Sequence, residues 1–135
     1  MLVVDASIAL TWCFEDEVTA ATEAIGTQID TDGAVVPGLW RLEVGNALLV
    51  AERRGHLNKR KVEERLALLS ALPISVDAET DTQAWQDTIL LARAHKLTLY
   101  DACYLELAIR IGATLATLDA ALARAARHFG VAVVP

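Results

Sequence analysis

Short apolar runs alternate with longer helical segments along the whole chain, and this alternation limits the fold more than any other feature. The short runs are rich in β-branched residues and uncharged, as fully buried parallel strands are. The pattern predicts a three-layer α/β/α domain around a central, mostly parallel sheet of four or five short strands. The expected strands are Leu2–Val4, Ala34–Val36, Ile74–Val76, Ala113–Leu118 and Val131–Val134.

The clearest helix is expected over Leu39–Arg54, between Pro37 and Gly55. Proline costs little near the start of a helix because an N–H there lacks a partner anyway, and glycine commonly ends a helix. Ala6–Phe14 is ambiguous and suits a turn with a short helix, whereas the polar segment Asp30–Gly33 predicts a turn. The other expected helices are Val18–Ile29, Asn58–Ala71, Thr80–His95, Tyr100–Ile111 and Ala120–Phe129.

The aromatic residues are expected to serve mainly in packing. Within Thr80–His95, the apolar spacing places Trp85, Ile89 and Ala92 toward the core. Trp12 and Trp40 are likewise expected as core or interface anchors rather than platforms for stacking bases. Three histidines lack the spacing of metal ligands and are expected at the surface or at helix ends: His56, His95 and His128.

The 135 residues are 54% apolar, with a mean hydropathy of +0.36, and are expected to form a single domain, 1–135, with a substantial core. The net charge of −6 argues against a protein that coats nucleic acid through a basic surface. Cys13 and Cys103 lie in apolar patterns without metal-ligand spacing, which suits a reducing, intracellular setting. No signal peptide and no long uncharged apolar run is visible, so no membrane span is expected.

Two acidic residues directly follow expected strands. Asp5 comes after Leu2–Val4, and Asp119 comes after Ala113–Leu118. Ligand sites in open parallel sheets form outside the carboxyl ends of the strands, so these carboxylates are expected to lie at one edge. Asp101 opens the helix before the fourth strand and is expected at the same edge. Each acid also has a structural alternative: Asp5 as a hydrogen-bonding turn residue, Asp119 as a helix cap, and Asp101 as a first-turn acid favoured by the helix dipole.

Glu43 is the fourth candidate, and it lies in the middle of an expected helix. It shares the predicted inner stripe with Leu39, Ala47 and Val50, at steps of three and four residues. An acid in the middle of a helix has no capping role, so the structural alternative is weaker here than for the other three acids. Asn46 lies one turn further along the same face.

Four carboxylates at one edge of a sheet would repel one another, and some would take up protons. Hard divalent cations with oxygen ligands relieve that repulsion. A site of this kind can bind a phosphodiester, activate a water molecule and stabilise both the attacking and the leaving oxygen. Two divalent ions would neutralise the four acids and so allow an acidic protein to bind an anionic substrate. In this interpretation one carboxylate, Asp119, orients the attacking water.

A basic segment runs from Arg53 to Arg65, in contrast to the acidic chain as a whole. It holds six of the twelve Lys and Arg residues and only two acids, Glu63 and Glu64, which gives it a net charge of +4. A local basic patch can guide a phosphodiester chain even on an acidic protein. The alternative is a solvated edge between two helices.

Four motifs together resemble those of the PIN-domain family. They are VVDASIAL with Asp5, RLEVGNAL with Glu43, LTLYDACYLELA with Asp101 and LATLDAAL with Asp119. Each is weak alone, but their order and spacing are specific jointly, and the resemblance runs from Leu2 to Val134. The short form of the chain is similar to the VapC ribonuclease toxins of toxin–antitoxin pairs.

The resemblance implies a metal-dependent endoribonuclease that uses Mg²⁺ or Mn²⁺. Asp5 and Asp101 match the family's main metal-ligand positions, and Asp119 and Glu43 match acids that bind the metal directly or through water. The resemblance also implies a homodimer in the cytoplasm and a VapB-like antitoxin, which lays a helix in an apolar groove and a tail toward the acids. Three further positions match polar neighbours of the site: Ser7, Asn46 and Thr117.

Two other functions remain open from the sequence. The first is a catalytically silent PIN-like module that acts only through its protein partner; the intact set of four acids argues against it. The second is a phosphotransfer receiver domain, which needs an acidic pair after its first strand and a lysine after its last. Val4 precedes Asp5 here, so the acidic pair is absent. Asp77 follows the third expected strand, where a receiver has its phospho-acceptor aspartate, but no lysine follows the last expected strand, so the receiver ranks lowest.

Overall fold

The computed structural model describes all 135 residues, and its centre is a parallel sheet of five short strands. Spatial order across the sheet is β3–β2–β1–β4–β5, and every neighbouring pair is parallel. The three-layer α/β/α prediction and the strand number are therefore confirmed. The strands are β1 (Leu2–Val4), β2 (Ala34–Val36), β3 (Ile74–Val76), β4 (Thr114–Ala116) and β5 (Val133–Val134).

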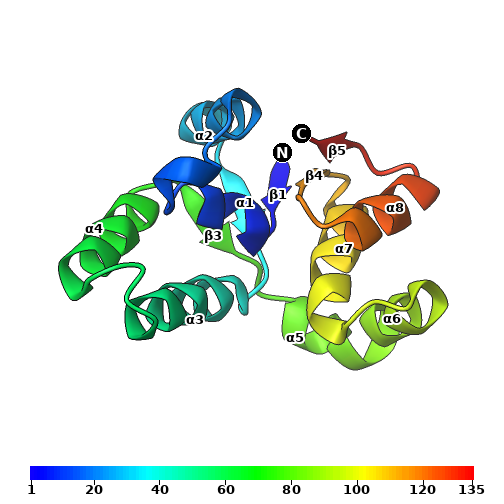
Figure 1. Ribbon diagram of the computed structural model, residues 1–135. Coiled ribbons are helices and arrows are strands. Elements are labelled where there is room, and N and C mark those ends of the chain that lie inside the picture. The colour runs from blue at the N-terminus through cyan, green and yellow to red at the C-terminus, as the bar shows by residue number, and fades with distance from the viewer.

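The strand order arises because the chain adds strands to the sheet first on one side of β1 and then on the other. From β1 the chain moves outward to β2 and β3, then returns across the sheet to β4 and ends at β5. Right-handed crossovers then require the helices of the two halves to cover opposite faces. Figure 1 shows α3 and α4 on one side of the strands and α7 and α8 on the other. The helices are α1 (Ala6–Thr11), α2 (Ala20–Asp32), α3 (Trp40–Arg53), α4 (Lys59–Ser70), α5 (Thr80–Gln83), α6 (Ile89–His95), α7 (Leu99–Ile111) and α8 (Ala120–His128).

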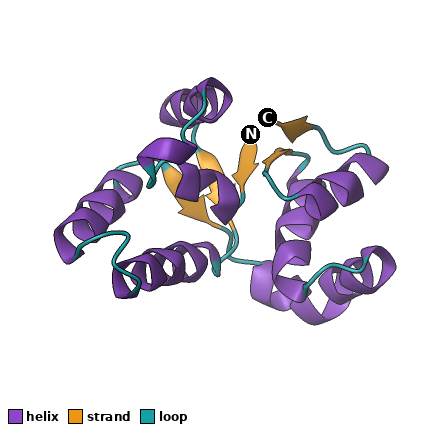
Figure 2. Cartoon of the chain, viewed as in Figure 1, coloured by secondary structure: helices purple, strands orange, loops and turns teal.

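The core forms around the two central strands. All three residues of β1 are fully buried, and Leu115 and Ala116 of β4 are buried beside them. Figure 2 shows the short strands enclosed by helices on either side, which explains why the strand sequences are continuously apolar instead of alternating. Both cysteines are buried and free. No helix is both long and apolar enough to cross a membrane.

The predicted continuous helix over Thr80–His95 is wrong. The chain forms α5, then a widened turn over Ala84–Thr88, and then α6; Gln86 in the turn has non-helical angles of φ −109° and ψ −108°. A widened turn of this kind shifts the side chains that follow it relative to a regular helix. Trp85, predicted to face the core, lies within this turn and is 84% exposed.

The predicted inner stripe of α3 is displaced by one residue. The buried residues are Trp40, Val44, Leu48 and Ala51, whereas Glu43 lies half-buried at the border of that stripe. The apolar character of α3 extends around much of the helix, so the sequence alone allowed two neighbouring stripes. The Asp30–Gly33 turn is also wrong, because α2 continues to Asp32 and ends at Gly33, which has φ 75°.

The receiver-domain alternative does not fit the observed strand order. Receiver-type sheets of the flavodoxin-like class have the order 2-1-3-4-5. Here β2 lies between β1 and β3, and β4 lies on the other side of β1. The switch in winding direction therefore falls between β1 and β4, and β4 is the strand that precedes Asp119.

Candidate active site

Asp5 lies at the point where the two central strands end. Val4 pairs with Ala116 in the parallel register, so the residues that follow them, Asp5 and Thr117, emerge side by side. The Thr117 hydroxyl donates to Asp5 Oδ2 over 2.8 Å, and the Ser7 hydroxyl donates to the same oxygen over 2.7 Å. Asp5 is only 5% exposed. A buried carboxylate is thus held in one orientation by two hydroxyl donors.

The same two hydroxyls fix the loop that carries Asp119. Ser7 Oγ accepts a hydrogen bond from the Leu118 backbone N–H, and Thr117 Oγ1 accepts one from the Asp119 N–H, each over 3.0 Å. Asp119 then caps α8 by accepting from the Leu122 N–H over 2.8 Å. The capping role expected as an alternative is therefore present, and it uses only one carboxylate oxygen.

Asp101 and Glu43 reach this edge from two helices on opposite sides of the sheet. Asp101 is in the first turn of α7, where its N–H donates to the capping hydroxyl of Thr98 over 3.1 Å. Glu43 is in the first turn of α3 and accepts a hydrogen bond on Oε1 from the Tyr104 hydroxyl over 2.5 Å. Both acids are half-buried.

The four acids influence one another electrostatically. Burial raises the pKa of Asp5, and the negative charge of Asp119 raises it further. Burial also raises the pKa of Asp101, with added contributions from Asp119 and Asp5. Burial raises the pKa of Glu43, the Tyr104 hydrogen bond opposes the rise, and the charges of Asp5 and Asp101 add to it. These mutual effects identify a shared region of negative charge assembled from four separate segments.

The carboxylate oxygens divide into bonded and free atoms. Asp5 accepts both hydroxyl bonds on Oδ2, Glu43 accepts its bond on Oε1 and Asp119 accepts its bond on Oδ1. Each of these acids keeps its other oxygen without a side-chain donor. This donor set suits a hard divalent cation. In the side-chain conformations of this structure, however, no group of three or more His, Cys, Asp and Glu residues is arranged to hold a metal ion.

The sequence-predicted residues do not all lie together. Ser7 and Thr117 contact Asp5 directly, whereas Asn46 is exposed and makes no side-chain hydrogen bond to Glu43. Tyr104 was not anticipated. The spacing of three residues after Asp101, which places two side chains on one face of a helix, could have revealed it.

Two further clusters lie away from the acids. Arg110 forms an ion pair with Glu106 within α7 and joins this helix to the segment after β3 through ion pairs with Asp77 and Glu79. His95 and His128, expected at the surface or at helix ends, are the last residues of α6 and α8. Their ring centroids are 5.1 Å apart, and they form an aromatic cluster with Phe129. This cluster joins the ends of α6 and α8.

The chain is a parallel α/β domain, a class of protein in which ligand sites form at the carboxyl edge of the sheet, and Asp5 and Asp119 lie at that edge here. The chain matches the PIN domain family over residues 2–128, and it belongs to this family. It is 33% identical over 123 residues to Ribonuclease VapC3 of Pyrobaculum aerophilum, a match that spans 90% of this chain and 92% of the relative.

Solved structures show the same fold at lower sequence identity. PAE2754 of P. aerophilum has a TM-score of 0.67 and 23% identity, and the match covers 98% of this chain and 88% of that one. VapBC2 of Rickettsia felis, bound to a DNA fragment from its promoter, has a TM-score of 0.68 and 11% identity and covers 98% and 96% of the two chains. VapC20 of Mycobacterium tuberculosis, a sarcin-ricin loop cleaving toxin, has a TM-score of 0.65 and 14% identity and covers 93% and 95%.

Proposed function

We propose that this protein is a metal-dependent endoribonuclease and the toxin of a VapBC-type pair. The observation that carries the proposal is electrostatic: the pKa of Asp5, of Glu43 and of Asp101 is raised by burial and also by the negative charge of one or two of the other acids, Asp119 included. Membership of the PIN domain family and the 33% identity to a VapC ribonuclease support the same activity.

The four acids would hold Mg²⁺ or Mn²⁺ through their carboxylate oxygens. When bound, such an ion lowers the pKa of a coordinated water and offsets the charge of the phosphate. Asp5, fixed by Ser7 and Thr117, is the most rigid member of the set. Asp119 is exposed and keeps one oxygen free, so it is the acid we assign to orienting the attacking water.

Metal-dependent RNA cleavage is the direct test. We expect the purified protein to cut a mixed-sequence RNA in the presence of Mg²⁺ or Mn²⁺ and to lose this activity in EDTA. Activity should return when excess Mg²⁺ is added back. Products resolved on denaturing gels give the measurement, and cleavage that persists in EDTA would contradict the proposal.

The competing function is a PIN-like module that acts only by binding its partner. A protein with that role has no need of a cluster of acids in which burial raises the pKa of Asp5, Glu43 and Asp101, because buried charges cost stability. If the protein binds its partner but shows no metal-dependent cleavage of any RNA, the competing function is correct.

We further propose that the active protein is a cytoplasmic homodimer controlled by an antitoxin. Neighbours of the same fold include VapBC2, which was solved with a fragment of promoter DNA, and this supports an antitoxin partner for the present chain. Co-expression with a cognate VapB-like antitoxin should suppress the toxicity of this protein, and size-exclusion chromatography with light scattering reports the assembly.

The basic segment Arg53–Arg65 supports an RNA substrate and lies where α3 turns into α4. Lys59 and Arg65 are paired with Glu63 and Glu15 at 4.0 and 3.8 Å. The remaining cations of the segment are exposed and have no acidic partner within ion-pair distance: Arg53, Arg54, Arg60 and Lys61.

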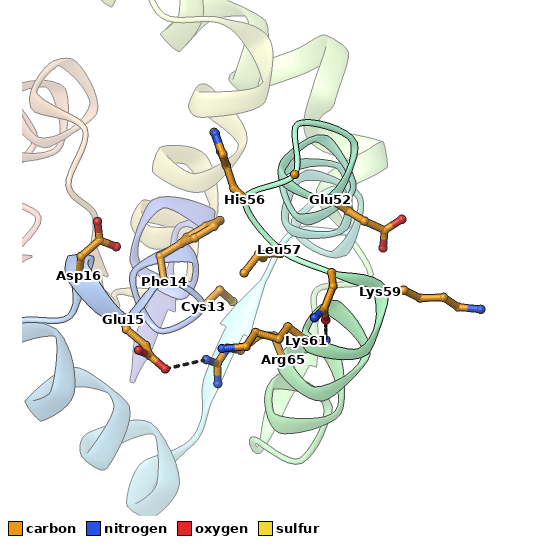
Figure 3. Close-up of a pocket in the computed structure, with 12 residues that line it drawn as sticks. Cys13, Phe14, Glu15, Asp16, Glu52, His56, Leu57, Lys59, Lys61 and Arg65 are labelled. Atoms are coloured by element: carbon orange, nitrogen blue, oxygen red, sulfur yellow. Dashed lines mark hydrogen bonds and ion pairs between the residues drawn. The ribbon is translucent and has the colours of Figure 1, made fainter.

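Figure 3 shows a pocket of about 670 Å³ beside this turn, between the segment after α1 and the start of α4. Lys59, Lys61 and Arg65 line it, but so do Glu15, Asp16 and Glu52, and the charges balance. The positive excess therefore comes from Arg53, Arg54 and Arg60, which do not line the pocket and lie on the exposed rim of the α3–α4 turn. Glu43 lies near the other end of α3. At a rise of about 1.5 Å per residue, it is about 15 Å along the helix from Arg53 on this rim.

Replacing Arg53, Arg54, Arg60 and Lys61 by glutamine is expected to weaken RNA binding and flatten its dependence on salt. For single-stranded RNA, the slope of log K against log salt becomes shallower by about 0.7 for each phosphate that the protein no longer neutralises. Fluorescence anisotropy on the Asp5→Asn variant, which should bind without cutting, gives the measurement.

A matched control removes the same number and kind of charges from α6 and α8. It carries glutamine at Arg93, Lys96, Arg124 and Arg127, all exposed and without an acidic partner. Equal losses of affinity in both variants would show that overall charge governs RNA binding, and not the α3–α4 turn.

A further inference from the structure

Tyr104 links the two helices that bring acids to the site. Its ring is fully buried on α7, and its hydroxyl donates to Glu43 Oε1 on α3 over 2.5 Å. Tyr104 is three residues after Asp101, so both side chains project from the same face of α7. One helix therefore supplies an acid to the site and also holds an acid supplied by another helix.

The hydrogen bond leaves Glu43 with a defined free oxygen. Glutamate has three rotatable side-chain bonds, and this one makes no other side-chain hydrogen bond. Asp5 and Asp101 repel it electrostatically. The tyrosine ring, by contrast, is immobilised by the core and has no exposed surface. Tyr104, which is the more rigid of the two side chains, therefore determines the position of the Glu43 carboxylate. Its hydrogen bond opposes the repulsion from Asp5 and Asp101.

We propose that Tyr104 is a positioning residue that holds Glu43 in the orientation needed to share a divalent cation with Asp5 and Asp101. This inference rests on the proposed function and deepens it. Tyr104 acts through Glu43 and does not itself contact the substrate or the ion. Its hydroxyl occupies Oε1 and leaves Oε2 for the cation, in the way that outer-shell partners orient the ligands of metal sites.

The test is Tyr104→Phe, which removes the hydroxyl and keeps the ring. The dissociation constant for Mn²⁺, measured by calorimetry without RNA, is expected to rise about 10-fold or more, as is typical when an outer-shell partner is removed. Tyr100→Phe is the matched control, because Tyr100 lies on the same helix but is 65% exposed and makes no hydrogen bond to an acid. It should bind Mn²⁺ like the wild type.

A double-mutant cycle separates positioning from general packing. If Tyr104 acts through Glu43, Tyr104→Phe will have no further effect on Mn²⁺ affinity in a Glu43→Gln background. Glu43→Asp is a second variant that leaves the core ring intact, and its shorter side chain cannot make the same hydrogen bond. It should weaken Mn²⁺ binding to a similar degree.

Three results would overturn the proposal. Unchanged Mn²⁺ affinity in Tyr104→Phe and Glu43→Asp, with a wild type that binds Mn²⁺ and cuts RNA, overturns the positioning role alone. An effect of Tyr104→Phe that persists in full in the Glu43→Gln background shows a structural role. A wild type that neither binds Mn²⁺ nor cuts RNA removes the proposed function and this inference together.

Discussion

Asp5→Asn is expected to lower RNA cleavage at saturating Mg²⁺ by at least about 100-fold, because even the loss of an outer-shell partner costs 10- to 100-fold at metal sites. Asp5 is the acid at the centre of the site, next to Thr117 across the paired ends of β1 and β4. The amide keeps the shape of the side chain and can still accept from the two hydroxyls. The loss of activity would therefore report on charge and not on packing.

Thermal unfolding of the metal-free variant provides the decisive companion measurement. Burial raises the pKa of Asp5 in the folded protein above its value in the unfolded chain. The protonated carboxyl therefore stabilises the fold fully at pH values below the unfolded-state pKa, and this stabilisation is lost as the pH rises through the folded-state pKa. At neutral pH the ionised group opposes folding, and Asp5→Asn should unfold at the same temperature as the wild type or higher. The matched control is Asp32→Asn, an exposed acid at the end of α2, which should keep full activity. A large drop in the unfolding temperature of Asp5→Asn would contradict this account.

Arg110→Met is expected to lower the free energy of unfolding by about 3 kcal/mol, because it leaves a buried carboxylate without its partner. The guanidinium donates to Glu106 Oε1 over 2.8 Å and to Asp77 Oδ2 over 2.6 Å. The Glu106 side chain is only 4% exposed and that of Asp77 10%. The midpoint of thermal unfolding should fall by roughly 10 °C in a domain of this size. Calorimetry on the wild type and the variant gives the measurement.

The pH dependence and a rescue variant identify the cause of that destabilisation. Arg110 lowers the pKa of Asp77, so the ion pair stabilises the fold above the unfolded-state pKa and is lost as the pH falls through the folded-state pKa. The difference between wild type and variant should therefore narrow in acid. Adding Glu106→Gln to Arg110→Met should recover part of the stability. The control is Arg93→Met, an exposed arginine without an ion pair, and an equal destabilisation there would contradict the assignment.

Much of the site could be predicted because Asp5 and Asp119 follow strands closely, and the sequence shows where those strands lie. The apolar run before Asp5 and the one before Asp119 both had to be buried strands, and parallel strands end at a common edge. The register Val4–Ala116 then makes Asp5 and Thr117 neighbours, whereas the sequence placed Thr117 beside the site only through the family resemblance. The presence of an acid on α3 was equally visible, although its stripe was misplaced by one residue.

Other features depend on interactions between residues far apart in the chain. The widened turn after α5, which exposes Trp85, contradicts a regular helical spacing that the sequence supports. The Tyr104–Glu43 hydrogen bond joins residues 61 positions apart. The Arg110–Asp77 hydrogen bond joins residues 33 positions apart. Local periodicity can place Tyr104 on the same face of α7 as Asp101, but it cannot show which distant residue Tyr104 or Arg110 will contact.

By itself the sequence determined the α/β class, the short buried strands and the placement of two acids at strand ends, because hydrophobic burial and strand direction act locally and repeat along the chain. Only the tertiary structure decided how those acids are held. The Thr117 hydroxyl that donates to Asp5, the Tyr104 hydroxyl that donates to Glu43 and the Arg110 guanidinium that donates to Asp77 all come from other segments. These bonds form because a buried polar group needs a hydrogen-bond partner, and only the folded chain brings that partner close.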